Sequence, residues 1–319
     1  MGVLGLGWSL LRRMPPLLAW RILHSTPATL LDAIAKVEGR PRYADEYSIE
    51  FLGAKLGNPI GLAAGMDKDG RLVWVSWSIG FGFHVIGSVL PEPNPGVEPK
   101  ILVRIPDGGT INRLGLPSPG VDRVVANLRG RRPSGMPIVG SIAAFTPEGY
   151  GIVYEKLARY VDWVEVNVSC PNVREHSTFE KPEAIREICR HIRSTDKPVL
   201  LKIPPTSDLD RLREYIDVAR ACGFAGIVAS NTRKVLYKGY NAGLGGPRLY
   251  DVVKRMIEIL REEAPSHFKL VAVGGIDEPW KVRELIEKGA DLVEVLSSLV
   301  HKGPAVVRNM LRGLKGYLA

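Results

Sequence analysis

The sequence VEVNVSCPN, residues 164–172, predicts a buried β-strand that runs into a polar loop. Valine occupies every second position, which is typical of a strand, and Pro171 ends the strand because it has no N–H to donate. Asn167, Cys170 and Asn172 therefore lie at or beyond the strand's end. Such groups are costly in a core but useful at the mouth of a barrel, where donors converge on a ligand. A lone cysteine is most often a small buried apolar residue, so the flanking amides carry the functional interpretation.

From residue 60 onward, strand patterns alternate with helix patterns. This order predicts parallel strands joined by right-handed crossovers, and eight such units predict closure into an α/β fold of the (β/α)8 TIM barrel type. An open, doubly wound sheet is the alternative. The expected strands cover residues 60–64, 83–89, 137–143, 163–168, 199–203, 226–229, 270–273 and 292–296, and the expected helices include 150–160, 183–192, 209–221, 250–263 and 279–288.

Two hairpins interrupt this alternation. Residues 48–51 and 54–56 flank Gly53 and predict a hairpin that plugs the barrel floor. Residues 101–105 and 110–114 flank an Asp-Gly-Gly turn and predict a second hairpin, inserted after the second strand. We expect this insertion to form a lid over the face of the barrel that carries the site.

The first 45 residues differ in character from the rest. They are apolar, are broken by prolines at 15–16, and carry three arginines but no acidic residue before Asp32. No stretch reaches the roughly 20 apolar residues that span a bilayer, and the basic pair follows the apolar run instead of preceding it as in a signal peptide. Such helices suit a membrane interface, although helices that cap the barrel would look the same. We expect a helical extension over 1–45 and a barrel over 46–319.

Cysteine content and charge limit the classes of partner. Cys170, Cys189 and Cys222 are odd in number and have no metal-ligand spacing. They argue against a disulfide framework and for free thiols in a reducing compartment. The formal net charge of +9 suits nucleic acid, an anionic membrane or an anionic small molecule, but no long Lys/Arg run marks a nucleic-acid surface. We expect no metal and no nucleic-acid partner.

Polar residues gather just after the expected strands, where barrel enzymes carry their sites. Residues 63–70 place small residues and Lys68 after the first strand, Lys202 ends the fifth, and the segment 230–232 follows the sixth. No Ser-His-Asp trio or metal cluster occupies these ends. Two lysines and several amides therefore indicate an anionic, planar ligand, although either lysine alone would more often be a solvated surface residue.

Glycines and hydroxyl groups follow the last two strands. Gly274 and Gly275 come after the seventh strand, Ser297 and Ser298 after the eighth, and residues 243–247 add a second glycine-rich segment. Barrel enzymes commonly hold phosphate here, although a glycine pair alone is a weak signal. The chain has neither a GxGxxG turn opening a helix nor a P-loop. Flavin mononucleotide (FMN) in the barrel mouth fits better than a dinucleotide.

Five motifs taken together resemble the dihydroorotate dehydrogenase family. They are GLAAGMDKDG (61–70), INRLG (111–115), NVSCPN (167–172), SNT (230–232) and VGGID (273–277), and the resemblance runs in order from about residue 48 to 305. It implies an FMN barrel that oxidises (S)-dihydroorotate to orotate in pyrimidine biosynthesis.

The resemblance also implies which residues surround each ligand. Those expected around FMN are Ala64, Gly65, Met66, Asp67, Lys68, Ser88, Ser141, Asn167, Lys202, Ser230, Gly246, Gly275, Leu296 and Ser297. Those expected around the substrate are Lys68, Asn112, Arg113, Leu114, Gly115, Leu116, Asn167, Asn172, Asn231 and Thr232.

The chemistry gives several of these residues a reason. Orotate carries a carboxylate and an imide, so amide side chains can pair with its edges and Lys68 can offset its charge. Oxidation removes a proton from C5 and a hydride from C6, so a base must face the flavin across the substrate. Cys170 is placed for that role, and Lys202 would stabilise the anionic reduced flavin.

Some residues depart from the family pattern. The N-terminal helices resemble the membrane-associated, quinone-reducing class, whereas Cys170 is typical of the soluble classes. Ser141, Leu296 and Lys100 stand where Asn, Tyr and Arg are usual. We expect quinone as the oxidant and peripheral attachment to the cytoplasmic side of the cell membrane. The alternatives are a soluble-class enzyme in the cytoplasm with another oxidant, another FMN barrel such as a tRNA dihydrouridine synthase, and a non-enzymatic phosphate-binding barrel.

Overall fold

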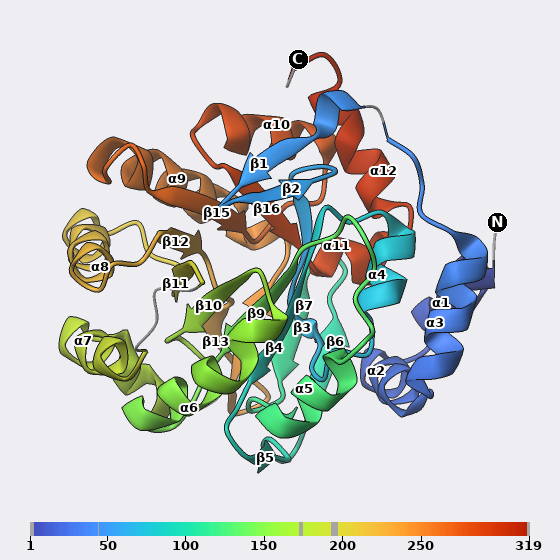
Figure 1. Ribbon diagram of the computed structural model, residues 1–319, viewed down its shortest axis with the longest axis horizontal. Coiled ribbons are helices and arrows are strands. Elements are labelled where there is room, and N and C mark those ends of the chain that lie inside the picture. The colour runs from blue at the N-terminus through green and yellow to red at the C-terminus, as the bar shows by residue number, and fades with distance from the viewer. Residues whose placement is uncertain (1–2, 44, 172–174, 193–196, 318–319) are drawn as a thin grey trace.

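A closed barrel of eight parallel strands forms the centre of the molecule (Figure 1). The computed structural model describes residues 3–43, 45–171, 175–192 and 197–317. The strands follow one another around the barrel in the order β10, β11, β12, β15, β16, β3, β4 and β9. This arrangement confirms the predicted (β/α)8 barrel and excludes the doubly wound sheet. The barrel strands are β3 (Ile60–Asp67), β4 (Phe83–Val89), β9 (Ile138–Ile142), β10 (Trp163–Asn167), β11 (Val199–Ile203), β12 (Gly226–Ala229), β15 (Lys269–Val273) and β16 (Leu292–Val295).

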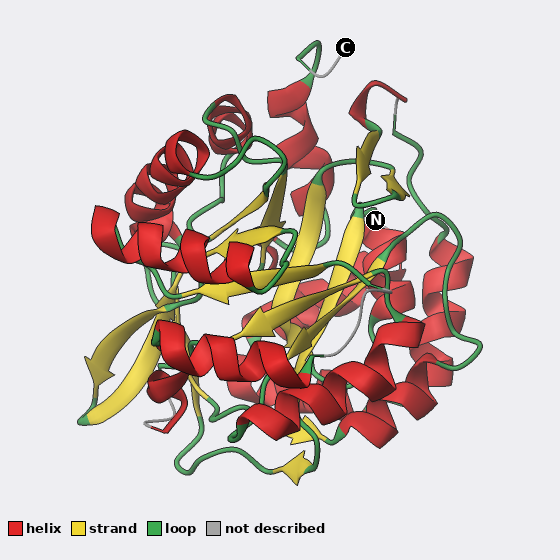
Figure 2. Ribbon diagram, turned by 60° about the vertical axis from the view of Figure 1, so that its left-hand side comes forward, coloured by secondary structure: helices red, strands yellow, loops and turns green. Residues whose placement is uncertain are grey.

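Helices cover the outside of the barrel, as Figure 2 shows. Side chains fix where several of them begin: the Thr146 hydroxyl accepts a hydrogen bond from Gly149 N, and Asp208 accepts one from Arg211 N. The covering helices are α4 (Val73–Ile79), α5 (Val121–Leu128), α6 (Pro147–Leu157), α7 (Pro182–His191), α8 (Leu209–Ala221), α9 (Tyr250–Glu263), α10 (Pro279–Glu287), α11 (Ser297–Lys302) and α12 (Val306–Leu311). The short elements are η1 (Asp45–Tyr47), η2 (Ala158–Tyr160), η3 (Glu175–Glu180), η4 (Pro247–Leu249), η5 (Arg312–Leu314), β5 (Pro93–Asn94) and β8 (Ser118–Pro119).

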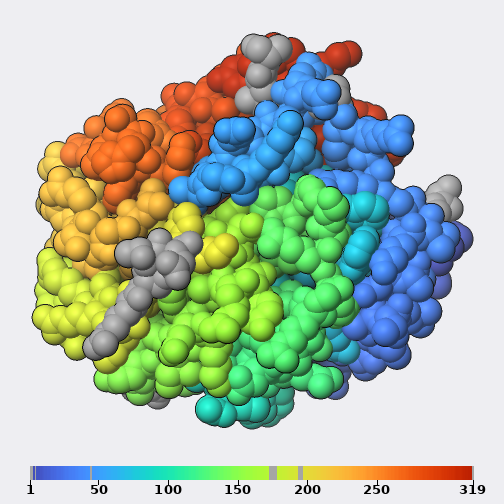
Figure 3. All heavy atoms as spheres, in the orientation of Figure 1, coloured from blue at the N-terminus to red at the C-terminus, as the bar shows by residue number. Residues whose placement is uncertain are grey.

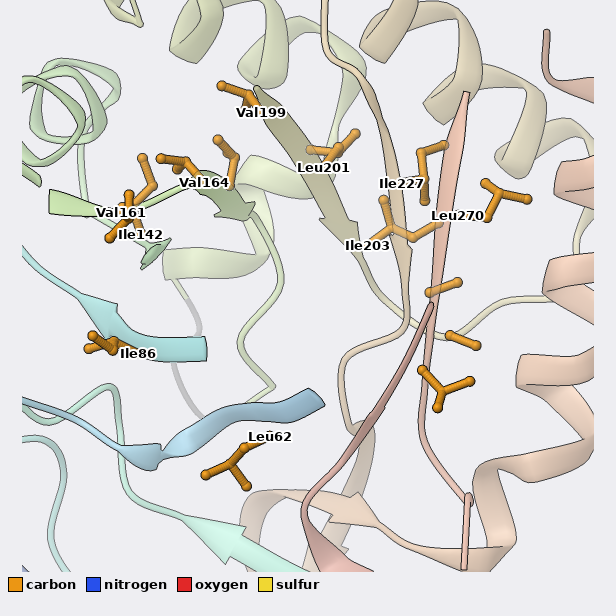
Figure 4. Close-up of a cluster of buried hydrophobic side chains, with 14 of the residues drawn as sticks. Leu62, Ile86, Ile142, Val161, Val164, Val199, Leu201, Ile203, Ile227 and Leu270 are labelled. Atoms are coloured by element: carbon orange, nitrogen blue, oxygen red, sulfur yellow. The ribbon is translucent and has the colours of Figure 1, made fainter. Parts of the chain in front are cut away.

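Apolar side chains of the barrel strands alternate between two clusters, as the period of two along a strand requires. Val164, Leu201 and Ile227 belong to the outer cluster, which packs against the helices (Figure 4). Trp163 and Leu200 belong to the inner cluster, which fills the amino-terminal half of the barrel. The next inward-facing positions along the same strands are polar, so the barrel has an apolar floor and a polar mouth.

The predicted floor hairpin is confirmed. β1 (Ile49–Phe51) pairs with β2 (Ala54–Leu56) in antiparallel register. Phe51 packs against the Trp163 ring with the ring centroids 5.3 Å apart, and Leu56 is fully buried in the same cluster. Figure 3 shows the light-blue hairpin over the barrel end that faces the viewer. The opposite end is therefore the one available to a ligand.

The inserted hairpin forms part of a larger sheet. β6 (Ile101–Arg104) and β7 (Thr110–Arg113) pair as expected, and β7 also pairs with β14 (Tyr240–Gly245), which pairs with β13 (Arg233–Tyr237). The second hairpin was missed because β13 is largely exposed and lacks apolar alternation. The sequence feature that could have indicated this hairpin is Gly239, which forms its turn together with Lys238. Both residues have positive φ in the structure.

Three N-terminal helices pack beside the barrel: α1 (Val3–Arg13), α2 (Pro16–Ser25) and α3 (Ala28–Glu38). Arginines of the barrel unit hold them. Arg104 donates to Met14 O at 2.5 Å, Arg71 donates to the carbonyl oxygens of His24 and Thr26, and Arg131 pairs with Asp32 at 2.7 and 2.9 Å. No helix among the described residues is both long and apolar enough to cross a bilayer.

The expectation of free thiols is wrong for two of the three cysteines. Cys189 on α7 and Cys222 after α8 form a disulfide, with Cα atoms 5.7 Å apart. Their separation of 33 residues gives no sequence signal, because the contact arises from the packing of α7 against α8. Cys170 is a free, buried cysteine.

Candidate active site

A cavity opens at the carboxyl ends of the barrel strands and continues to the N-terminal helices. We call its two sides the barrel wall and the helical wall. The barrel wall includes Lys68, Asn112, Asn167, Cys170, Lys202 and Asn231, and the helical wall comprises Trp8, Leu11, Arg12, Pro16, Ala19, Trp20 and Leu23. One side is thus built from amides and charges, and the other almost entirely from apolar groups.

Asp67 organises the turn that carries Lys68. Its carboxylate accepts hydrogen bonds from the backbone N–H groups of residues 69–72 and, at 2.9 Å, from the ring of His84. Burial alone would raise the pKa of Asp67, but these hydrogen bonds and the nearby His84 hold it well below its usual value. Asp67 is therefore a buried anion that shapes the loop and directs Lys68 into the cavity.

Lys68 lies beside Cys170 inside the cavity. Its ammonium donates to Gly87 O at 3.2 Å. Burial lowers the pKa of Lys68 to about 8; the charge of Cys170 opposes this shift and that of Lys202 adds to it. An ammonium next to a thiol favours the thiolate, so the pair places a cation and a potential base against the same ligand.

The amides of the barrel wall are fixed by hydrogen bonds to one another. Asn167 Nδ2 donates to Ser88 Oγ at 2.8 Å, and Asn231 Nδ2 donates to Asn167 Oδ1 at 3.1 Å. Ser88 Oγ lies 3.1 Å from Ser141 Oγ, and Asn112 Nδ2 donates to Gly243 O at 3.2 Å. Donors held in this way need no rearrangement to meet a planar polar ligand.

Lys202 stands between two buried carboxyl groups. Its Nζ lies 3.1 Å from Glu165 Oε2 and 3.1 Å from Glu294 Oε2. Burial alone would lower the pKa of Lys202, but the two carboxylates raise it above that of an ordinary lysine. Burial and the charge of Glu165 raise the pKa of Glu294 well above its usual value. Lys202 is therefore a permanent cation of the cavity.

The far end of the barrel wall fits a phosphate group. Gly246 and Gly275 have φ of 101° and 76°, and a Cβ added at either would lie within 2.5 Å of backbone. Only glycine fits such a close approach. Ser298 Oγ is buried there and has no hydrogen-bond partner in the described structure. An orphaned hydroxyl beside a glycine cradle is what the phosphate of a bound mononucleotide would satisfy.

Most of the residues predicted for the site line this one cavity. They are Ala64, Gly65, Met66, Lys68, Ser88, Asn112, Leu114, Leu116, Asn167, Cys170, Lys202, Ser230, Asn231, Thr232, Gly246, Gly275, Leu296 and Ser297.

Four predicted residues lie outside its lining, and one cannot be placed. Asp67 supports the loop, and Ser141 lies behind Ser88. Arg113 stacks on Tyr240 at 4.7 Å and donates to a backbone carbonyl. Gly115 packs closely against Val97. Asn172 falls outside the described residues.

Sequence reasoning assigned no role to several residues of the cavity. Glu165 and Glu294 had a visible signal, a glutamate inside an otherwise apolar strand, which requires a buried partner. Thr110, whose hydroxyl lies 2.8 Å from Ser297 Oγ, had none, because its contact joins segments far apart in sequence. For the N-terminal helices the sequence predicted a role in quinone reduction but not which of their side chains line the cavity.

The fold and the cavity are those of a (β/α)8-barrel protein whose strand ends offer amides and cations to an anionic ligand. A sequence model of dihydroorotate dehydrogenase matches residues 47–318. The chain belongs to the dihydroorotate dehydrogenase family. It is accordingly a flavin-dependent oxidoreductase of pyrimidine biosynthesis that acts on a CH–CH bond, which excludes the dihydrouridine synthase and the non-enzymatic barrel.

Similar proteins agree with this assignment. The chain is 33% identical over 281 residues to a protein named dihydroorotate dehydrogenase (quinone) from Christiangramia forsetii, covering 82% of each chain. A protein of the same name from Aliivibrio fischeri is 31% identical and is covered to 86%, with 83% of this chain aligned. The fold matches a structure of DHODH from Eimeria tenella in complex with ferulenol, with a TM-score of 0.79, 23% identity and 91% of each chain covered.

Proposed function

We propose that this chain oxidises dihydroorotate to orotate with FMN as the hydride acceptor, and that a quinone re-oxidises the flavin. The observation that carries the proposal is one cavity with two unlike walls, one able to pair with a polar planar anion and the other suited to an apolar ring. The names of the relatives, which specify quinone, support the oxidant.

The substrate binds against the amides of the barrel wall. Asn112, Asn167 and Asn231 offer donors and acceptors to its carboxylate and imide, with Asn172 and Thr232 as further contacts. Lys68 offsets the substrate's negative charge. The side chains of Asn112, Asn167 and Asn231 are already held in place by hydrogen bonds. A ligand without matching groups would leave their remaining donors and acceptors unpaired, which favours orotate-like rings.

Cys170 removes the proton from C5. Its side chain is almost completely buried, so water does not compete for the proton, and Lys68 stabilises the thiolate that must be present before proton transfer. Bound FMN supplies the acceptor for the hydride from C6. Gly246, Gly275 and Ser297 would hold its phosphate, and Ala64, Gly65, Ser88 and Lys202 would border its ring.

The quinone reaches the flavin along the helical wall. Trp20 lines this wall, and its Nε1 is buried with no hydrogen-bond partner in the described structure. A quinone carbonyl would supply the missing acceptor. The remaining lining side chains, such as Leu11 and Leu23, offer an apolar surface for the ring and its tail.

The outer side of the N-terminal helices supports peripheral attachment to the cytoplasmic side of the cell membrane. Leu6 and Leu10 on α1 are 55% and 60% exposed, and Leu18 on α2 is 47% exposed. Arg13 and Arg21 accompany these apolar groups, which favours an anionic lipid surface. Arg12, by contrast, lines the cavity and donates to His301 O at 3.4 Å. Residues 1–45 would then form the membrane and quinone segment, and residues 46–319 the FMN-binding barrel.

Stopped-flow absorbance of the flavin tests the function. Dihydroorotate added without air should bleach the purified protein, and a short-chain ubiquinone should restore its colour. Ala19→Trp fills the helical wall and should slow only the second step, while Leu18→Trp, one residue away on the exposed side, should slow neither. A flavin that dihydroorotate does not bleach would reject the activity; equal slowing of both steps by Ala19→Trp would reject the quinone route.

Vesicle flotation tests the attachment. The full chain should float with vesicles containing phosphatidylglycerol, and Leu6→Glu with Leu10→Glu should abolish flotation without affecting flavin bleaching. Flotation that survives both changes would reject this membrane face.

A further inference from the structure

Three charged side chains are buried together inside the barrel, one layer above its apolar floor. Glu165, Lys202 and Glu294 come from β10, β11 and β16, and each lies two residues beyond an inward-facing apolar residue of its own strand. Their exposed fractions are 0%, 4% and 1%. Alternation along the strands therefore forces all three toward the barrel axis.

The charges of this cluster do not balance if every group is ionised. Lys202 Nζ contacts Oε2 of both glutamates at 3.1 Å, which leaves two carboxylates for one ammonium. The Oε1 atoms of Glu165 and Glu294 have no hydrogen-bond partner in the described structure. The charges of Glu165 and Glu294 both raise the pKa of Lys202. The charge of Lys202 acts in turn on Lys68, which lines the cavity together with Cys170. An unpaired anion in a dry interior is strongly unfavourable.

We propose that Glu165 and Glu294 share one proton, so that they and Lys202 form a cluster with no net charge beneath the flavin ring. Glu165 and Glu294 are then positioning residues, which hold Lys202 and set the charge that the flavin meets. The raised pKa of Glu294, due to burial and to Glu165, agrees with a shared proton. The effect on the flavin rests on the flavin site proposed above, whereas the shared proton does not.

The proton count matters for electron transfer. A cation beside the flavin favours its reduction, because the reduced ring carries negative charge. Two ionised carboxylates around Lys202 would cancel this help and add a net negative charge. With one shared proton, Lys202 still favours reduction of the flavin, and the two buried carboxyl groups still have a hydrogen-bond partner.

Infrared spectroscopy of the purified protein tests the shared proton. A buried carboxylic acid gives a carbonyl band distinct from that of a carboxylate, and 13C-labelled glutamate assigns the band to glutamate. We expect a slowly exchanging band in the parent protein and its loss in Glu294→Gln, because the remaining carboxylate then pairs alone with Lys202. Glu155→Gln, at an exposed position on α6, should keep the band.

The flavin potential provides the second readout. If one proton is shared, glutamine replaces a neutral acid, and Glu294→Gln should change the equilibrium constant for two-electron reduction less than twofold. If both groups were ionised, the same change would remove a negative charge and raise that constant about tenfold, or about 30 mV. A potential shift of that size, a parent without the band, or a band that persists in the variant would each overturn the proposal.

Glu165→Gln is the equivalent test if Glu294→Gln does not fold, since Lys202 contacts the two glutamates alike, and the parent spectrum decides the question if neither folds. Failure of dihydroorotate to bleach the flavin would reject the proposed function but would leave the infrared result standing.

Discussion

The two walls of the cavity are built on different principles. On the barrel wall, each polar group is fixed by a second contact, as Asn167 is by Ser88 and Lys68 by Gly87 O. On the helical wall, apolar side chains come from helices whose outer faces carry exposed leucines. Recognition of a polar ring needs donors at fixed positions, whereas an apolar ring needs only a surface to cover. In the proposed function, the two half-reactions use different walls, so each one can be perturbed separately.

The largest effect should follow loss of the base on the barrel wall. Cys170→Ala should slow flavin reduction by dihydroorotate about 10²- to 10⁴-fold, the usual contribution of a general base, and leave re-oxidation by quinone unchanged. Stopped-flow measurement of both steps checks this. Cys170→Ser should keep activity with its pH optimum displaced upward, because a hydroxyl is a weaker acid. Reduction of Cys170→Ala at the parent rate would remove Cys170 from the mechanism.

The scaffold of the barrel wall can be weakened without touching the site. Cys189→Ser opens a loop of 33 residues, which should lower the free energy of unfolding by about 3 to 4 kcal/mol. For a chain of 319 residues, this corresponds to a midpoint about 5 °C lower. Thermal unfolding should show that dithiothreitol lowers the parent's midpoint equally and leaves the variant's unchanged. A parent insensitive to reductant would contradict a stabilising disulfide.

The barrel wall should also respond to pH through Lys68. Since burial lowers its pKa to about 8, the ammonium is present below that value and is lost as pH rises through it. Affinity for the orotate anion should therefore be constant at lower pH and fall up to tenfold per unit above about pH 8. Titration of the flavin spectrum with orotate checks this. Cys170→Ala should keep this pH dependence, and Lys68→Met should bind orotate weakly at every pH. An orotate affinity of the parent protein that does not change up to pH 10 would contradict the role of Lys68.

The smallest effect should come from the helical wall. Trp20→Phe keeps an aromatic surface but removes the buried N–H, which should raise the quinone KM about fivefold, a cost of ~1 kcal/mol. The dihydroorotate step should not change. Steady-state kinetics with a short-chain ubiquinone measure the effect, with Trp280→Phe, exposed on α10, as the control. A change in both half-reactions would mean that the walls are not independent.

Sequence patterns predicted the barrel wall far better than the helical wall. Strands β4, β11 and β12 have the predicted limits, because buried parallel strands are continuous apolar runs. The sequence alone predicted that Lys68, Cys170 and Lys202 share one site, because the carboxyl ends of all barrel strands meet at one rim. The hairpin β13–β14 and the disulfide left little or no trace in the sequence, because exposed strands and contacts between packed helices do not impose a period. Glu165 and Glu294 were visible as buried charges, but their common partner required the register of three strands.

The arginines that hold the N-terminal helices have a consequence for how this region can change over time. Arg71 donates hydrogen bonds to the backbone carbonyl oxygens of His24 and Thr26, and Arg104 donates one to that of Met14. Every amino acid supplies such an oxygen, so this part of the attachment places no demand on side-chain identity at those positions. Substitutions at these positions can therefore accumulate while the hydrogen bonds that attach the helices to the barrel remain. The same property makes the helical segment a candidate for exchange between related enzymes.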